Sequence, residues 1–190
     1  MLAIAGAQRA IYIENQAIPV PPVAKALEEA LKRGVEVVVL VPATPEENVR
    51  AARRDPQRQA LFDHVARLDL YDRFALVGIA APNLAGERRD IYVHAKIMLV
   101  DDEWATIGSC NLHERSLGGH TEMNASVWDA TVVRPLRCAL LAEHLGLDTA
   151  HLDAHEASRL YRSIAKENRR RRDTNDPAWQ GIAYRLDAAG

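Results

Sequence analysis

The apolar run at residues 35–41 constrains the fold more than any other part of this sequence. It reads Val-Glu-Val-Val-Val-Leu-Val, and a nearly continuous β-branched run is typical of a strand that is covered on both faces of a sheet. Apolar residues recur on one helical face from Val23 to Leu31 just before it, and Gly34 ends that helix. A shorter strand pattern at 9–15 precedes the helix. This strand, helix, strand order predicts a parallel pair of strands with helices packed on the sheet.

Later strand patterns extend this sheet at 74–79, 91–100, 104–107 and 122–128. The connection at 101–103 is short enough to join antiparallel neighbours. We therefore predict an α/β fold in which a mixed β-sheet is flanked by helices on both faces. The other helical patterns lie at 46–67, at 136–145 and from Asp153 onward, and residues 82–89 are predicted to form a loop.

Length and charge limit the organisation and the partners. The chain has 190 residues, the length of one ordinary α/β domain. We assign residues 1–168 to a single lobe and residues 169–190, which open with four arginines, to a polar peripheral tail. A formal charge of −2 provides no general attraction for polyanions, so nucleic acid is the less favoured partner. Cys110 and Cys138 fit no metal or disulfide framework. With no export or membrane-spanning pattern, we expect a cytoplasmic protein and leave peripheral membrane contact open.

Chemically active residues gather in the second half of the predicted sheet. His94 and Lys96 lie two apart in a predicted strand, so their side chains should point to the same side. Gly108, Ser109 and Asn111 end the next strand. Lysine is almost never buried without a partner, so Lys96 requires an edge position or an anionic ligand. An imidazole, an ammonium, a hydroxyl and an amide at one sheet edge are what phosphodiester cleavage needs. The six other histidines share no metal-site spacing, and we expect neither a metal nor another cofactor.

One spacing resembles the HKD signature of the phospholipase D superfamily: His94-x-Lys96-x4-Asp101-x6-Gly108-Ser109-x-Asn111. The resemblance covers about residues 11–146. It is closer to the lipid-cleaving branch than to the nucleases, because residues 11–16 read Ile-Tyr-Ile-Glu-Asn-Gln. Ala17 departs from the family pattern, which has an aromatic residue after that glutamine, and this leaves the shape of the substrate groove open.

The resemblance implies a phospholipase-D-like lobe that hydrolyses or transfers phosphodiesters through a phosphohistidine, without a metal. Phospholipid is the implied substrate, with conversion of a phosphatidylcholine-type lipid to phosphatidate. His94, Lys96, Asn111 and Glu122 are the implied catalytic residues, and Glu122 matches the acidic residue that orients a catalytic histidine. Without the resemblance, Glu122 reads as a surface residue on a half-exposed strand.

Three further residues are assigned to phosphate binding or structural support. Ser109 and Gly108 flank the loop that holds Asn111, and turn formation alone would also explain Ser109. We expect Asp101 to organise the turn rather than to touch substrate. Gln16 is most simply the end of a strand, with a role in the substrate groove as the minor alternative.

Members of the superfamily join two HKD elements across a cleft, and this sequence contains one. Of its four lysines, only Lys96 has a histidine two positions before it. The resemblance therefore implies a second lobe, from a homodimer partner or from a missing amino-terminal half. His94 is then the general acid beside an amino-terminal half, and it shares both roles in a homodimer. Two alternatives stay open: a dimeric HKD nuclease, and an orphan half-lobe that binds phosphate or membrane without turnover.

Overall fold

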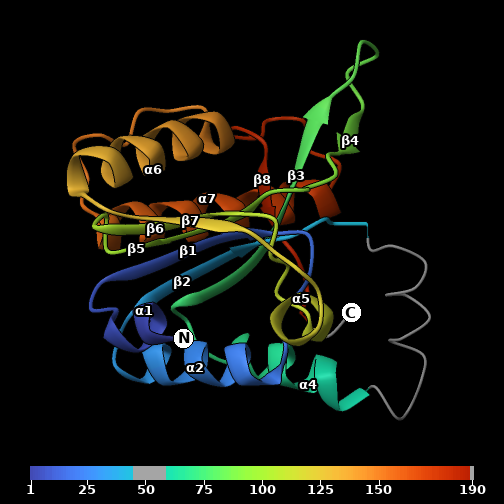
Figure 1. Cartoon of the computed structure of the whole chain (residues 1–190). Helices are drawn as coiled ribbons and strands as arrows, with labels where there is room; N and C mark the ends of the chain where they lie inside the picture. The colour runs from blue at the N-terminus through green and yellow to red at the C-terminus, as the bar shows by residue number, and fades with distance from the viewer. Residues whose placement is uncertain (45–58, 189–190) are drawn as a thin grey trace.

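The computed structural model describes residues 1–44 and 59–188. It contains an eight-stranded sheet in the order β4-β3-β2-β1-β5-β6-β7, and β8 also pairs with β3 (Figure 1). The strands are β1 (Ala10–Asn15), β2 (Glu36–Leu40), β3 (Phe74–Pro82), β4 (Arg88–Asp90), β5 (Lys96–Val100), β6 (Trp104–Gly108), β7 (Asn124–Trp128) and β8 (Ala183–Arg185). The helices are α1 (Leu2–Gly6), α2 (Pro21–Lys32), α4 (Gln59–Leu68), α5 (Glu114–Gly118), α6 (Ala130–Leu145) and α7 (Ala154–Asp173).

The sheet is mixed, as predicted. β1, β2 and β3 are parallel, and the other paired strands are antiparallel. The crossover helix α2 begins at Pro21 and Pro22, whose fixed φ suits a first helical turn. It ends before Gly34, which has a φ of +94° that other residues rarely adopt.

Helices cover both faces of the central strands. Figure 1 shows α1, α2, α4 and α5 on one side of the sheet and α6 and α7 on the other. Alternate residues of β2 enter two separate cores: Val37 and Val39 pack on the α2 side, and Val38 and Leu40 pack on the α7 side. All of β2 is consequently buried. This accounts for its continuous apolar sequence.

The start of the strand predicted at 91–100 differs in the structure, and this difference affects the site. β5 begins at Lys96, not at residue 91, so the prediction that His94 lies inside a strand is wrong. β4 lies at one side of the β3–β2–β1 group and β5 at the other. The connection at 91–95 runs from β4 to β5: Ile91 donates to the Ile79 carbonyl oxygen of β3, and residues 92–95 pair with no strand of the described chain.

Other boundaries differ as well. The predicted loop at 82–89 is partly a hairpin, because β3 continues to Pro82 and pairs with β4. α6 begins at Ala130, where the Asp129 carboxylate caps the Thr131 N–H, well before the pattern that predicted it. α1 and α5 were not predicted. Of the helix predicted at 46–67, residues 46–58 lie outside the described residues.

The last part of the chain is not wholly peripheral, which corrects the prediction for 169–190. α7 continues through the proposed division at 168 to Asp173, and β8 pairs with β3. The Asn168 amide donates to the carbonyl oxygens of Gln180 and Ala183, which fixes β8 against the helix. The arginine run is neutralised locally, for example by Glu167, which pairs with two of its members. Over the described ranges, no helix is both long and apolar enough to cross a membrane.

Candidate active site

Lys96 occupies the first position of β5, opposite Asn15 at the end of β1. Its side chain is on the α2 side of the sheet, and the residue is only 8% exposed. The Lys96 Nζ donates to Gln16 Oε1 at 2.9 Å and to the His94 carbonyl oxygen at 2.7 Å. Burial lowers the pKa of Lys96, and the negative charge of Glu122 acts in the opposite direction. Both of these hydrogen-bond acceptors are neutral, so within the described residues no carboxylate is hydrogen-bonded to this ammonium.

His94 lies in the connection just before β5 and is exposed. Its ring stacks on Tyr92, with 6.3 Å between ring centroids and 24° between ring planes. Strand alternation predicted that the His94 and Lys96 side chains point to the same side of the sheet. In the structure they are joined by the hydrogen bond from Lys96 Nζ to the His94 backbone.

The residues that follow β6 are held close to β7. A Cβ at Gly108 would lie 2.2 Å from the Met123 carbonyl oxygen, so only glycine fits there. Ser109 Oγ donates to Glu122 Oε2 at 2.5 Å and accepts from the Met123 N–H. The loop therefore depends on glycine for its close approach and on a serine hydroxyl for its attachment.

Glu122 precedes β7 and receives two hydroxyl groups. Ser109 binds one carboxylate oxygen, and Ser116 Oγ donates to the other at 2.5 Å. These hydrogen bonds lower the pKa of Glu122, so the carboxylate is ionised at neutral pH. Its hydrogen-bond partners among the described residues are serines, and the orientation of a histidine by Glu122 stays a prediction.

The side-chain oxygen of Asn111, Oδ1, is both buried and unpaired among the described residues. Leaving a buried acceptor unpaired costs roughly 1–3 kcal/mol, which is typical of a group that pairs with a ligand or partner.

The loop containing Asn111 is tied to β1 by Asn15, a residue that sequence reasoning treated only as a strand end. Asn15 Oδ1 accepts from the N–H groups of Leu112 and Ala17, and its amide nitrogen donates to the Cys110 carbonyl oxygen. The motif at 11–16 and the motif at 108–111 thus form one structural unit.

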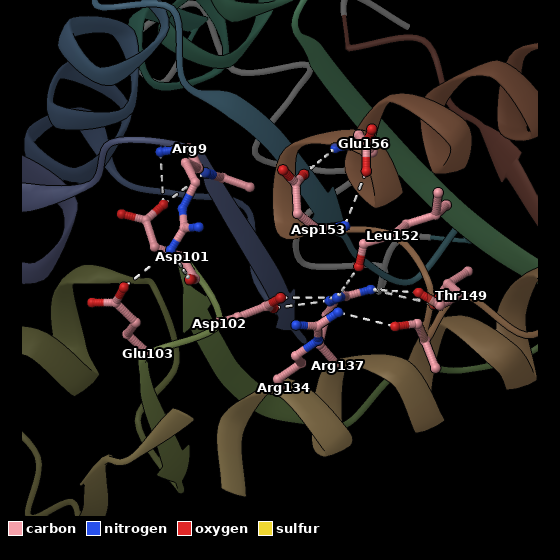
Figure 2. Close-up of polar contacts among 12 residues, drawn as sticks. Arg9, Asp101, Asp102, Glu103, Arg134, Arg137, Thr149, Leu152, Asp153 and Glu156 are labelled. Carbon is pink, nitrogen blue, oxygen red and sulfur yellow. Dashed lines mark hydrogen bonds and ion pairs between the residues drawn. The ribbon is translucent and has the colours of Figure 1, made fainter. Parts of the chain in front are cut away.

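Asp101 lies at the far end of β5 from Lys96, away from the other candidate residues. Its carboxylate accepts from the N–H groups of Gln8, Arg9 and Ala10, as Figure 2 shows in part. Its φ of +56° is in the left-handed region, which aspartate tolerates better than most residues. These contacts organise the turn and align the start of β1.

The next residue anchors the same turn to the helices (Figure 2). Asp102 accepts two hydrogen bonds of 2.8 Å from the buried Arg137 of α6. Arg137 also donates to the carbonyl oxygens of Thr149 and Leu152, just before α7.

Of the candidate catalytic residues, Lys96 lines a groove of about 550 Å³. Lys96, Asn15 and Asn124 lie at one end, where the strands β1, β5 and β7 meet the Cys110 loop. Along the sheet face the lining is mostly apolar, with Ile13, Met98, Trp104, Leu112, Leu117 and Ile4. The groove therefore joins a cationic end to an apolar channel.

Comparison with known proteins identifies the family. Residues 2–142 match the family described as "Cardiolipin synthase, PLD-like domain". The chain is 30% identical over 137 residues to cardiolipin synthase 1 of Staphylococcus epidermidis, covering 72% of this chain and 24% of that protein. It is 40% identical over 83 residues to phospholipase D1 of Schizosaccharomyces pombe, covering 35% of this chain and 6% of that protein. The chain thus spans less than a third of the length of either relative.

The fold also matches a solved structure. NucT from Helicobacter pylori superposes with a TM-score of 0.55 at 15% identity, covering 72% of this chain and 79% of that one. The mixed sheet with its helices is therefore the phospholipase-D-like lobe that the sequence predicted. The family match shows that the chain belongs to the PLD-like domain family of the phospholipase D superfamily.

Proposed function

We propose that this lobe hydrolyses or transfers phosphodiesters of phospholipids through a phosphohistidine intermediate, once a second HKD lobe is joined to it. The observation that supports a lipid most directly is the groove that starts at Lys96 and continues along apolar side chains. A molecule with an anionic phosphate at one end and hydrocarbon at the other matches both parts.

The proposed chemistry uses two imidazoles. One histidine nitrogen attacks phosphorus, and the leaving alcohol departs with a proton from the opposing imidazolium. Water or another alcohol then attacks phosphorus and gives its proton to the second imidazole, while the P–N bond breaks. His94 supplies one of the two rings. It is the general acid beside an amino-terminal half, and in a homodimer the two copies of His94 share both roles.

The other candidate residues stabilise charge. Lys96 and the Asn111 amide hold the equatorial oxygens, where negative charge develops in the transition state. Ser109 and Gly108 keep the Asn111 loop in place, and Glu122 fixes Ser109 and Ser116. Asp101 acts from the other end of β5, through the turn.

Two exposed side chains support a second lobe beside the site. Met123, next to Glu122, and Trp128, at the other end of the β7 segment, are each 82% exposed. In the described chain, β7 is the outer strand of the sheet on this side. We propose that this edge faces the second lobe, because large exposed apolar groups at a sheet edge favour a partner.

The test compares three substrates at several protein concentrations. Head-group release is measured from micelles of a short-chain phosphatidylcholine, cleavage is measured on DNA, and bis(p-nitrophenyl) phosphate serves as a soluble diester. Oligomeric mass is followed in parallel. We expect phospholipid turnover whose rate per chain rises as chains associate. Faster cleavage of DNA would indicate the nuclease alternative, and a monomer inactive at every concentration would indicate an orphan half-lobe.

A groove variant sharpens the substrate test. Leu117 lines the groove and is 49% exposed, so Leu117→Glu places a charge there without burying it fully. We expect about a tenfold lower rate on phospholipid and an unchanged rate on the soluble diester. The control is Leu70→Glu, at an exposed leucine outside the groove. Equal effects of both variants on phospholipid turnover would remove the groove from the proposed function.

A further inference from the structure

A glutamine side chain links the candidate catalytic lysine to a tyrosine. Gln16 Oε1 accepts from Lys96 Nζ at 2.9 Å, and Gln16 Nε2 donates to the Tyr92 hydroxyl oxygen at 2.7 Å. These two partners require opposite ends of the amide, so together they fix its orientation. Gln16 follows β1 directly, and Tyr92 lies in the connection before β5.

The same tyrosine contacts the candidate catalytic histidine. The Tyr92 and His94 rings stack at a centroid distance of 6.3 Å. The Lys96 Nζ donates a hydrogen bond to the His94 carbonyl oxygen at 2.7 Å. The contacts therefore close a ring through His94, Tyr92, Gln16 and Lys96.

Two members of this ring of contacts, Tyr92 and His94, lie outside the strands. Residues 91–95 are outside the strands, since the ladder between β1 and β5 starts only at the Asn15 and Lys96 pair. His94 thus has no strand hydrogen bonds to hold its backbone, and its ring is exposed. Side-chain contacts must supply the alignment that in-line attack on phosphorus needs.

We propose that Tyr92 and Gln16 are positioning residues for the His94 and Lys96 pair. Tyr92 sets the plane of the imidazole by stacking, and Gln16 sets the position of the ammonium. The amide is neutral, so it holds Lys96 without cancelling the charge offered to a phosphate. This inference rests on the proposed function, because positioning has a catalytic meaning only if the pair acts on a phosphodiester.

Three variants separate these contributions. Tyr92→Phe keeps the ring and loses the hydroxyl, whereas Tyr92→Leu loses both. Gln16→Glu places a carboxylate against Lys96. Tyr71→Phe is the matched control, because the Tyr71 hydroxyl also forms a side-chain hydrogen bond, to Glu28, outside the site.

The kinetic readout is the split between kcat and KM on the soluble diester. We expect kcat to fall about 3-fold in Tyr92→Phe and about 100-fold in Tyr92→Leu, since a 1 Å misplacement of a reacting group costs on the order of 100-fold. We expect Gln16→Glu mainly to raise KM, about tenfold, because the ammonium is then paired. Tyr71→Phe should match the wild-type protein. Rescue of most of the rate by phenylalanine is the signature of ring stacking.

A second readout does not require turnover. The ring protons of His94 lie beside an aromatic ring, so their NMR resonances in the resting protein should shift in Tyr92→Leu and stay near their wild-type position in Tyr92→Phe. If the His94 resonances do not move in folded Tyr92→Leu, Tyr92 does not position His94. A wild-type kcat in that variant would overturn the positioning role as well. If the wild-type protein cleaves no phosphodiester but the resonances move as expected, the proposed function has failed and the stacking has not.

Discussion

Arg137 holds Asp102 through two parallel hydrogen bonds of 2.8 Å inside the protein. The Arg137 and Asp102 side chains are 4% and 12% exposed, and the arginine also donates to carbonyl oxygens at Thr149 and Leu152. The turn between β5 and β6 is therefore fixed to α6 and to the segment before α7. Because β5 begins with Lys96, this ion pair supports the strand on which the candidate site is built.

Removing one member of that pair should destabilise the fold strongly. Arg137→Met leaves the Asp102 carboxylate buried without its counter-ion, and we expect the free energy of unfolding to fall by about 3–5 kcal/mol. Urea denaturation measures this. Arg134→Met, on the same helix but exposed, should change it by less than about 1 kcal/mol. Similar losses in the two variants would contradict the importance of the buried pair.

Asp101 should matter for stability and not for chemistry. Asp101→Asn removes the charge that accepts three backbone N–H groups, and hydrogen bonds to charged groups contribute about 1.5–3 kcal/mol each. We expect a lower thermal midpoint, with kcat per folded molecule unchanged below the transition. A folded variant with full stability and a lost rate would instead indicate that Asp101 contacts substrate.

The His94 and Lys96 pair should show the reverse behaviour. We expect His94→Ala and Lys96→Ala each to lower phosphodiester turnover by about 1000-fold or more, with the far-UV circular dichroism of the folded lobe retained. His151→Ala, at an exposed histidine outside the site, is the control. Wild-type rates in either site variant would show that the site has been misassigned.

A buried histidine should make the fold sensitive to mild acid. His144 contacts the hydroxyls of Tyr12 and Tyr161, and burial lowers the pKa of His144 from its ordinary 6.5, while the nearby Glu143 acts in the opposite direction. As the pH falls through 6.5, the unfolded chain binds a proton at this position more readily than the folded protein does. The free energy of unfolding therefore falls as pH decreases through this range, by up to about 1.4 kcal/mol per pH unit.

The comparison with His144→Gln isolates that effect. Burial raises the pKa of Glu14, which lies in the same cluster and acts with the opposite sign, but both proteins contain it. Between pH 7.5 and pH 5.5, we expect the wild-type protein to lose more stability than the variant in urea titrations. Parallel pH profiles would mean that His144 titrates alike in the folded and unfolded chains.

Local patterns predicted much of this fold. The strand at 35–41 was recognisable because both of its faces are covered, so every residue had to be apolar or paired. The short turn at 101–103 indicated an antiparallel neighbour and hence a mixed sheet. The spacing from His94 to Asn111 indicated the family, since the imidazole, ammonium, hydroxyl and amide groups in that motif are the ones that phosphodiester cleavage needs.

What sequence reasoning missed depends on contacts between distant segments. The start of β5 is set by which strands lie between β4 and β5, and local alternation contains no information on strand order. The contacts of Gln16 with Lys96 and Tyr92 join residues about 80 positions apart, so neither could be read from spacing. The sequence did contain one indication of these contacts: Tyr92 is an aromatic residue two positions before His94. Because residues 91–100 were predicted to form a strand, Tyr92 was not considered as a partner of His94.

The pairing of β8 with β3 affects how the protein matures. One edge of β3 is unpaired until Ala183–Arg185 arrive, because β2 and β4 pair with its other edge and, in the described chain, β8 is the strand that pairs with this one. On a ribosome, β8 emerges after nearly all of the described chain. Until then, the unpaired backbone N–H and C=O groups along this edge of β3 can hydrogen-bond to other chains. Truncation within this final strand should thus yield protein that aggregates during synthesis, even though every residue of the HKD signature has already been made.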